Sequence, residues 1–169
     1  YGGLILGVLV SLWYLNRHHM PVWKTADLLV PSIAIGQAIG RWGCLFAGCC
    51  YGKETDAIFG ITFTNPRSLA PLETSLHPTQ IYLSLNALFI FIFLMILSKK
   101  KVFDGQVLWS YGILYSIGRF LIEYFRGDDR GFPIEQFLST SQFVGIFIFL
   151  LSSFMLLVLY RKNLRSHHS

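Results

Sequence analysis

Three charged residues interrupt otherwise apolar stretches of this sequence, and their types suit the binding of an anion. Arg41 lies in the run from residue 27 to 48, and Arg119 and Glu123 lie in the run from 105 to 125. An arginine inside a bilayer costs at least about 2.5 kcal/mol on insertion scales, so a partner must offset that cost. Guanidinium groups bind phosphate through paired hydrogen bonds. We therefore expect the two arginines to hold a phosphate diester at the depth of the outer lipid headgroups.

Helical spacing places polar side chains along one face of the segment around Arg119. Glu123 follows Arg119 by four residues and therefore shares its face. Tyr111 and Tyr115 extend that face toward one membrane surface, and Arg126 extends it toward the other. The stripe predicts a polar face directed into a helix bundle. An alternative interpretation is an internal ion pair on this face, with the other arginine extending to the outer interface.

Small and polar residues at neighbouring helix ends are expected at the same depth. Gly40 and Gly43 flank Arg41, so a lipid or another backbone can approach closely, although such glycines also serve close helix packing. His77 and Gln80 open the apolar run from 79 to 98. His77 is a candidate base or headgroup donor, and it is equally compatible with a role in starting the helix alone.

The cysteines, three in number, lie at positions 44, 49 and 50. Cys49 and Cys50 are expected at the outer face, where disulfides are allowed. Ideal helix geometry leaves Cys44 within reach of neither, unless the helix breaks after Gly48. The spacing C-x4-C-C is not that of a zinc site, so no metal site is predicted. Small packing residues are the default interpretation, with a disulfide or a reactive thiol as alternatives.

Composition indicates that the bundle lies in a membrane. Of the 169 residues, 53% are hydrophobic and 14% are charged, and the mean hydropathy is +0.52. Soluble domains carry about 25% charged residues, so this chain lacks the polar surface that covers a globule in water. Runs long enough to cross a bilayer predict an all-α integral membrane protein with one domain over residues 1–169. About five transmembrane helices are expected, at residues 1–16, 27–48, 79–98, 105–125 and 137–160.

Basic residues between the predicted spans set the orientation of the bundle. They gather on one side, at Arg17, Lys24, Lys99, Lys100, Lys101, Arg161, Lys162 and Arg165. That side, which includes the C-terminus, is predicted to be cytoplasmic. We interpret the basic clusters as orientation signals and not as a nucleic-acid site. Residue 1 and the long connection 51–76, a cap or partly re-entrant arm, are then outward. Because the chain starts without Met, we expect it to begin inside a helix, with further sequence upstream.

Four motifs occur along the chain in a fixed order. They are Tyr1-Gly2-Gly3-Leu4, Gly40-Arg41-Trp42-Gly43-Cys44, His77-Pro78-Thr79-Gln80-Ile81-Tyr82 and Gly118-Arg119-Phe120-Leu121-Ile122-Glu123-Tyr124-Phe125-Arg126. Together they resemble the motifs of bacterial prolipoprotein diacylglyceryl transferases. That family has seven spans, so five spans here match its C-terminal part. It transfers the diacylglyceryl group of phosphatidylglycerol to the thiol of a lipobox cysteine in a secreted preprotein, and glycerol phosphate leaves.

The resemblance implies roles for individual residues. Arg41 and Arg119 are expected to be catalytic, holding the phosphate and stabilising charge on the leaving group, and Glu123 is expected to orient Arg119. Tyr1 or His77 is the candidate base for the acceptor thiol. The expected substrate-binding residues are Gly2, Gly3, Gly43, Cys44, His77, Gln80, Tyr82, Tyr115 and Arg126. The implied partners are phosphatidylglycerol and a preprolipoprotein lipobox peptide at the bacterial plasma membrane, with no cofactor and no nucleic acid.

The chain also departs from the family pattern, which leaves two other functions open. The family has histidine where Tyr1 stands, and Asn, Asn and Glu where Cys44, Ala47 and Cys49 stand. One alternative is a non-catalytic membrane protein that binds an anionic phospholipid through the arginines. The other is an outer-face thiol-redox protein that uses Cys49 and Cys50.

Overall fold

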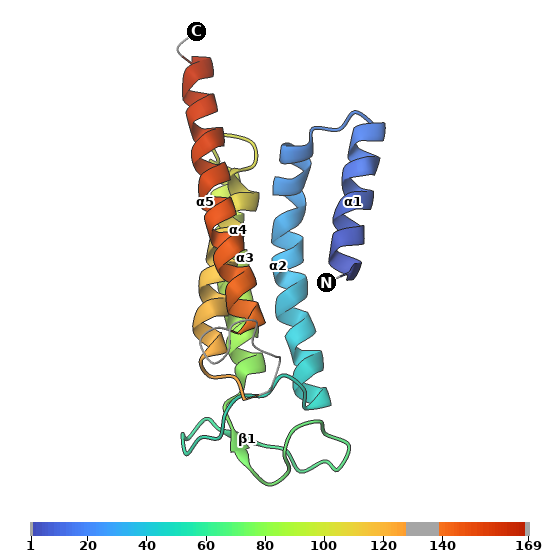
Figure 1. The fold of residues 1–169 in the computed structure, drawn as a ribbon, viewed down its shortest axis with the longest axis vertical. Coiled ribbons are helices and arrows are strands. Elements are labelled where there is room, and N and C mark those ends of the chain that lie inside the picture. Colours follow the sequence, from blue (N-terminus) through green and yellow to red (C-terminus); the bar gives the residue numbers. More distant parts are fainter. Residues whose placement is uncertain (1, 128–138, 168–169) are drawn as a thin grey trace.

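The computed structural model describes residues 2–127 and 139–167, which form a bundle of five helices (Figure 1). These are α1 (Gly2–Arg17), α2 (Val22–Ala47), α3 (Thr79–Lys100), α4 (Gln106–Glu123) and α5 (Thr140–His167). The predicted all-α membrane architecture is confirmed, since α2, α3 and α5 are long and apolar enough to cross a bilayer. The apolar part of α1 is shorter, and α4 contains Arg119 and Glu123. The first two residues of the predicted span 137–160 lie outside the described part of the chain.

Consecutive helices run in opposite directions, which sorts the connections to two ends of the molecule. The α1–α2 and α3–α4 turns lie at the same end as the C-terminus, and the long connection between α2 and α3 lies at the other (Figure 1). Helix α1 contacts only α2 among the described elements. The apolar core forms where α2, α3 and α4 meet, and its most buried side chains are Val30, Ala34, Ile90, Leu94 and Val107.

The connection between α2 and α3 packs over the end of the bundle opposite to the C-terminus, as predicted for a cap (Figure 1). It contains a short antiparallel ladder that the sequence did not predict, between β1 (Ile61–Thr62) and β2 (Ser75–Leu76). Gly52 lies between the start of α3 and the end of α4, where its N–H donates to the His77 carbonyl at 2.9 Å. A Cβ there would lie 2.6 Å from the carbonyl oxygens of His77 and Phe125, so the close approach requires glycine.

A buried carboxylate holds the opposite end together, and it was not singled out from the sequence. Asp27 of α2 is 3% exposed, and its two oxygens accept the N–H groups of Gly105 and Leu108, each at 2.9 Å. These donors belong to the first turn of α4, where backbone N–H groups lack helical partners and favour a negative charge. Lys101 pairs with Asp27 at 3.0 Å and with Asp104 at 2.7 Å. Burial lowers the pKa of Lys101, but these hydrogen bonds outweigh it and the net pKa is raised.

Two reciprocal hydrogen bonds between Ser139 and Gln142 cap the N-terminus of α5. The Ser139 N–H donates to Gln142 Oε1 at 3.1 Å, and the Gln142 N–H donates to Ser139 Oγ at 3.2 Å. This is a capping box, in which a Ser or Thr precedes a Glu or Gln by three residues before an apolar run. The pattern is present in the sequence as Ser139-Thr140-Ser141-Gln142. It therefore fixes the start of α5 from local sequence alone.

Replacing Asp27 should destabilise the bundle strongly. In Asp27→Ala the first turn of α4 loses its acceptor and Lys101 loses its buried partner, which costs on the order of 3–5 kcal/mol. The matched control is Asp104→Ala, because Asp104 is 52% exposed and an exposed ion pair contributes less than about 1 kcal/mol. Thermal unfolding in detergent micelles measures both, and equal losses of stability would contradict the capping role of Asp27.

Ser139→Ala should also lower the melting temperature, by less than Asp27→Ala. Loss of the cap costs about 1–2 kcal/mol. Ser139→Thr keeps a hydroxyl that caps a helix nearly as well, so it should restore most of the stability. The same unfolding assay compares the two variants, and a Thr variant as unstable as the Ala variant would argue against the capping box.

Candidate active site

Two buried arginines share one carboxylate at the C-terminal end of α4. Arg119 is 8% exposed and Arg126 is 6% exposed. Arg119 Nη2 lies 3.0 Å from Glu123 Oε2, and Arg126 Nε lies 3.8 Å from the same oxygen. The four-residue spacing puts Arg119 and Glu123 on one face of α4, and Arg126 reaches the same carboxylate from the turn that follows the helix. The predicted ion pair and shared face of Arg119 and Glu123 are thus present, and Arg126 joins them.

The first turn of α5 completes this ionic cluster. Arg119 Nη2 donates to Ser141 Oγ at 3.0 Å, and Ser139 Oγ donates to Glu123 Oε1 at 2.9 Å. The N-terminus of a helix carries partial positive charge, which favours the Glu123 carboxylate beside it. Ser139 and Ser141 were not predicted as site residues. The only signal for this segment in the sequence is the capping pattern Ser139-Thr140-Ser141-Gln142, which indicates a helix start. Each hydroxyl fixes one charged group, so the geometry of the cluster depends on both helices.

Backbone pairing with the long connection fixes the end of the cluster. Gly52 forms an isolated antiparallel bridge with Arg126. On either side, the Lys53 N–H donates to the Phe125 carbonyl at 2.8 Å and the Gly127 N–H donates to the Tyr51 carbonyl at 3.3 Å. Residues 51–53 therefore hold the segment that carries Arg126.

His77 and Tyr82 line a cavity next to the cluster. Nδ1 of His77 lies 3.1 Å from the Tyr82 hydroxyl, and the His77 and Phe125 rings meet edge to face at 5.3 Å. The cavity has a volume of about 420 Å³, and its lining residues are Phe59, His77, Tyr82, Leu121, Ile122 and Phe125. Its walls are mostly apolar, and two of its lining residues, Ile122 and Phe125, are adjacent in sequence to Glu123 and Arg126. This arrangement suits an apolar molecule whose polar end reaches the charged residues.

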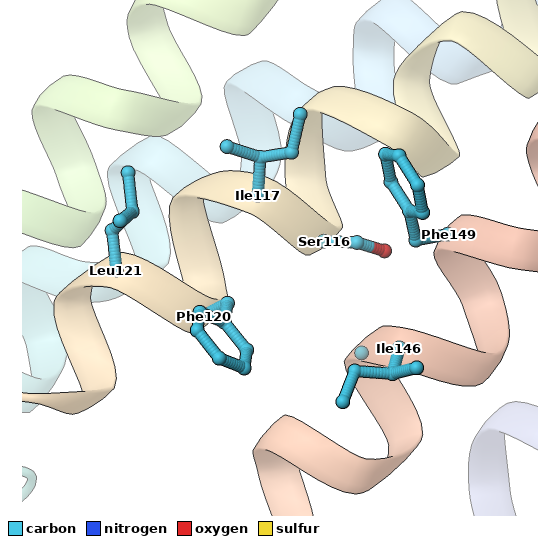
Figure 2. Close-up of a pocket in the computed structure, with 7 residues that line it drawn as sticks. Ser116, Ile117, Phe120, Leu121, Ile146 and Phe149 are labelled. Atoms are coloured by element: carbon cyan, nitrogen blue, oxygen red, sulfur yellow. The ribbon is translucent and has the colours of Figure 1, made fainter.

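A second, smaller cavity lies between α4 and α5 (Figure 2). It has a volume of about 180 Å³, and its lining residues are Ser116, Ile117, Phe120, Leu121, Gly145, Ile146 and Phe149. Figure 2 shows Phe120 of α4 facing Ile146 of α5 across the opening. Leu121 lines both cavities. The lining resembles lipid hydrocarbon, so the cavity suits an alkyl chain.

Arg41 is the predicted site residue that the structure does not join to the ionic cluster. It is half-buried on α2, and within the described part of the chain it makes no hydrogen bond or ion pair. Gly43 beside it is exposed, as are Gly2 and Gly3 on α1. Tyr1 lies outside the described residues. A joint phosphate site of Arg41 and Arg119 therefore remains a prediction.

Tyr115 lies two helical turns before Glu123 on the polar face of α4, on the side of α2. Its ring stacks on Tyr111 at 5.7 Å between centroids, and the Tyr111 hydroxyl donates to Gln37 Oε1 at 2.9 Å. Both tyrosines are half-buried. The polar face of α4 thus points into the bundle along its length, as the spacing predicted.

Gln80 serves the loop backbone, together with Thr79. Gln80 Nε2 donates to the Cys49 carbonyl at 2.8 Å, and Thr79 Oγ1 donates to the Cys50 carbonyl at 2.6 Å. Both side chains are at most 1% exposed. Gln80 thus holds the segment following α2, and its expected contact with the substrate stays a prediction.

The cysteines form a cluster at that segment. Helix α2 ends at Ala47, and Gly48 adopts φ +68° in the left-handed region, which turns the chain back. The Sγ atoms of Cys44, Cys49 and Cys50 all lie within 4.8 Å of one another. The helix break needed to bring Cys44 to the others is therefore present, and the expectation from ideal helix geometry is corrected. Burial first, and then the charge of Cys50, raise the pKa of Cys49 to about 11.

Comparisons with known proteins agree with the motifs. The family model described as prolipoprotein diacylglyceryl transferase matches residues 1–158. Three similar proteins bear the name phosphatidylglycerol–prolipoprotein diacylglyceryl transferase. That of Clostridium tetani is 42% identical over 92% of this chain and 61% of its own length. Those of Clostridium perfringens and Dehalococcoides mccartyi are 44% and 38% identical, over 88% and 89% of this chain and 57% of their own lengths.

The match to the family model extends over nearly the whole chain, whereas the chain spans only about three-fifths of these relatives. The matched region includes the ionic cluster on α4, the start of α3 and the cysteine segment. The chain belongs to the prolipoprotein diacylglyceryl transferase family.

Proposed function

We propose that the protein transfers the diacylglyceryl group of phosphatidylglycerol to the thiol of a lipobox cysteine in a prolipoprotein. A carbon–sulfur bond forms, the bond between the glyceryl carbon and the phosphate oxygen breaks, and glycerol phosphate leaves. The buried cluster of Arg119, Glu123 and Arg126 carries this proposal, because it places guanidinium groups at the outward end of a membrane bundle. The names of the relatives supply the two substrates.

The fixed position of Arg119 supports a role in stabilising the leaving phosphate. Glu123 and Ser141 hold its guanidinium group before any substrate arrives. A donor that is already oriented stabilises developing negative charge without a cost of reorganisation, and such an effect is worth several kcal/mol in a site shielded from water. Arg41 is proposed to contribute a second guanidinium group from α2 when the lipid binds.

The two apolar cavities support the binding of a lipid beside the cluster. The cavity at His77 is lined by Phe125, which precedes Arg126 in the sequence, and Leu121 lines both this cavity and the one between α4 and α5. We place the acyl chains along these walls, with the phosphate toward the arginines. His77 is the proposed base that takes the proton of the acceptor thiol, since it is the histidine that lines the cavity, and Tyr1 is a second candidate.

The distribution of charge supports a bacterial plasma-membrane protein with a cytoplasmic C-terminus. Lys99, Lys100 and Lys101 lie at the α3–α4 turn, at the same end as the C-terminus (Figure 1). Positively charged residues favour the cytoplasmic side of the membrane. The ionic cluster and the cavity at His77 then face outward, where prolipoproteins emerge from secretion.

Arg119→Gln and Arg41→Gln should each lower the rate of thioether formation about 100-fold or more, which is typical for loss of one charge-stabilising donor. The assay incubates the purified protein with labelled phosphatidylglycerol and a lipobox peptide and detects the lipidated peptide by mass spectrometry. Lys162→Gln is the control, because Lys162 is exposed near the C-terminal end of α5.

The same assay separates the proposal from lipid binding without catalysis. Bound phosphatidylglycerol with no thioether product, in conditions where a known transferase is active, would contradict the transferase proposal. Full product formation by both arginine variants would contradict the role of the arginines.

Fusions at the C-terminus test the orientation. Green fluorescent protein should be fluorescent there, and alkaline phosphatase should be inactive, because the first needs the cytoplasm and the second needs the oxidising outer side. The reverse pattern would place the ionic cluster on the cytoplasmic side and contradict the proposed orientation.

A further inference from the structure

We propose that Cys44, Cys49 and Cys50 form a three-thiolate site that binds one thiophilic metal ion, zinc(II) or copper(I). Their Sγ atoms lie within 4.8 Å of one another. Zinc–sulfur bonds are about 2.3 Å long, so thiolates around one ion lie about 4 Å apart. The three sulfurs thus need to move by less than about 1 Å to share an ion. The prediction of no metal site relied on sequence spacing, which the turn at Gly48 overrides.

The backbone around the thiols is held in place by buried contacts. The Cys49 N–H donates to the Cys44 carbonyl at 3.1 Å, which closes the turn after α2. From α3, Gln80 and Thr79 hold the carbonyl groups of Cys49 and Cys50. Cys50 itself adopts φ +60°, an unusual conformation for a residue other than glycine. These contacts fix the directions of the Cα–Cβ bonds, so the thiols converge through the fold and do not depend on flexible side chains.

The ligand set selects the class of metal. Sulfur ligands prefer zinc and copper(I), whereas magnesium and calcium require oxygen ligands. Within the part of the chain that the structure describes, the group contains no histidine or carboxylate beside the three cysteines. Three thiolates satisfy copper(I), and they leave a fourth position on tetrahedral zinc for water or another external ligand.

A bound cation would also offset the repulsion between the three neighbouring thiolates. When a metal binds, the three S–H protons pass to the solvent and three metal–sulfur bonds replace them. Arg41 precedes Cys44 by three residues, so its positive charge lies on the same helix face as the negative metal–thiolate group.

Metal titration tests the site directly. Reduced, metal-depleted protein in detergent is titrated with zinc(II) against a chromophoric chelator, and in a second arm with copper(I) under anaerobic conditions. One equivalent should bind tightly in at least one arm, and the arms identify the metal. Cys49→Ser should weaken binding at least about 100-fold, because one of three ligands is lost. His18→Gln in the α1–α2 turn is the control and should leave binding unchanged.

Alkylation provides a second measurement that does not depend on variants. N-ethylmaleimide should modify all three thiols of the metal-free protein and none when one equivalent of the metal is bound, as counted by intact mass. Equal alkylation with and without metal would overturn the proposal. So would tight binding that survives Cys49→Ser, or a disulfide in the isolated protein with no metal uptake after its reduction. None of these outcomes depends on transferase activity.

Discussion

Burying two guanidinium groups is the constraint that organises the end of this molecule where the long α2–α3 connection lies. Arg119 and Arg126 are accommodated because both guanidinium groups lie beside the carboxylate of Glu123, the last residue of α4. That carboxylate is in turn fixed by Ser139 at the start of α5, while residues 51–53 pair with the backbone around Arg126. The charged side chains therefore determine how α4, α5 and the long connection meet. In hydrocarbon surroundings apolar contacts alone give little preference for one arrangement, because lipid competes for them equally well.

The same type of interaction, a carboxylate beside a helix N-terminus, occurs at both ends of the α4–α5 pair. At the end with the basic turns, Asp27 accepts backbone N–H groups from the first turn of α4. At the other end, Glu123 accepts the Ser139 hydroxyl beside the first turn of α5. In each case a carboxylate from another element lies against a helix N-terminus, where the unpaired N–H groups and the helix dipole favour negative charge. The start of α4 is thereby fixed by Asp27, whereas α5 begins at its own capping box and Glu123 joins that start to α4.

Local sequence patterns predicted the helices and the polar face of α4, but not the contacts made between elements. Apolar runs define helices because hydrogen bonding within a segment is obligatory in lipid. The pairing of Arg119 with Glu123 follows from four-residue spacing. By contrast, Asp27 meets Gly105 across 78 residues, and Ser141 meets Arg119 across 22. No periodicity encodes such distant pairings. The approach of Cys44 to the other two cysteines depended on a helix break, and no periodicity showed that the left-handed turn at Gly48 supplies it.

The cysteine cluster and the ionic cluster are linked by a short piece of backbone. Cys50 is followed at once by Tyr51 and Gly52, the residues that pair with Gly127 and Arg126. Only two residues, which span at most about 8 Å, separate the cysteine turn from the segment that carries Arg126. A change in the backbone of the turn therefore also shifts that segment. Gln80 and Thr79 anchor the same turn to α3, next to His77 in the sequence. A metal ion held by the three thiolates would stiffen this turn, and with it the backbone that positions both Arg126 and His77. The cysteines at the positions where the family carries Asn and Glu would then replace polar side-chain contacts with a metal-fixed loop.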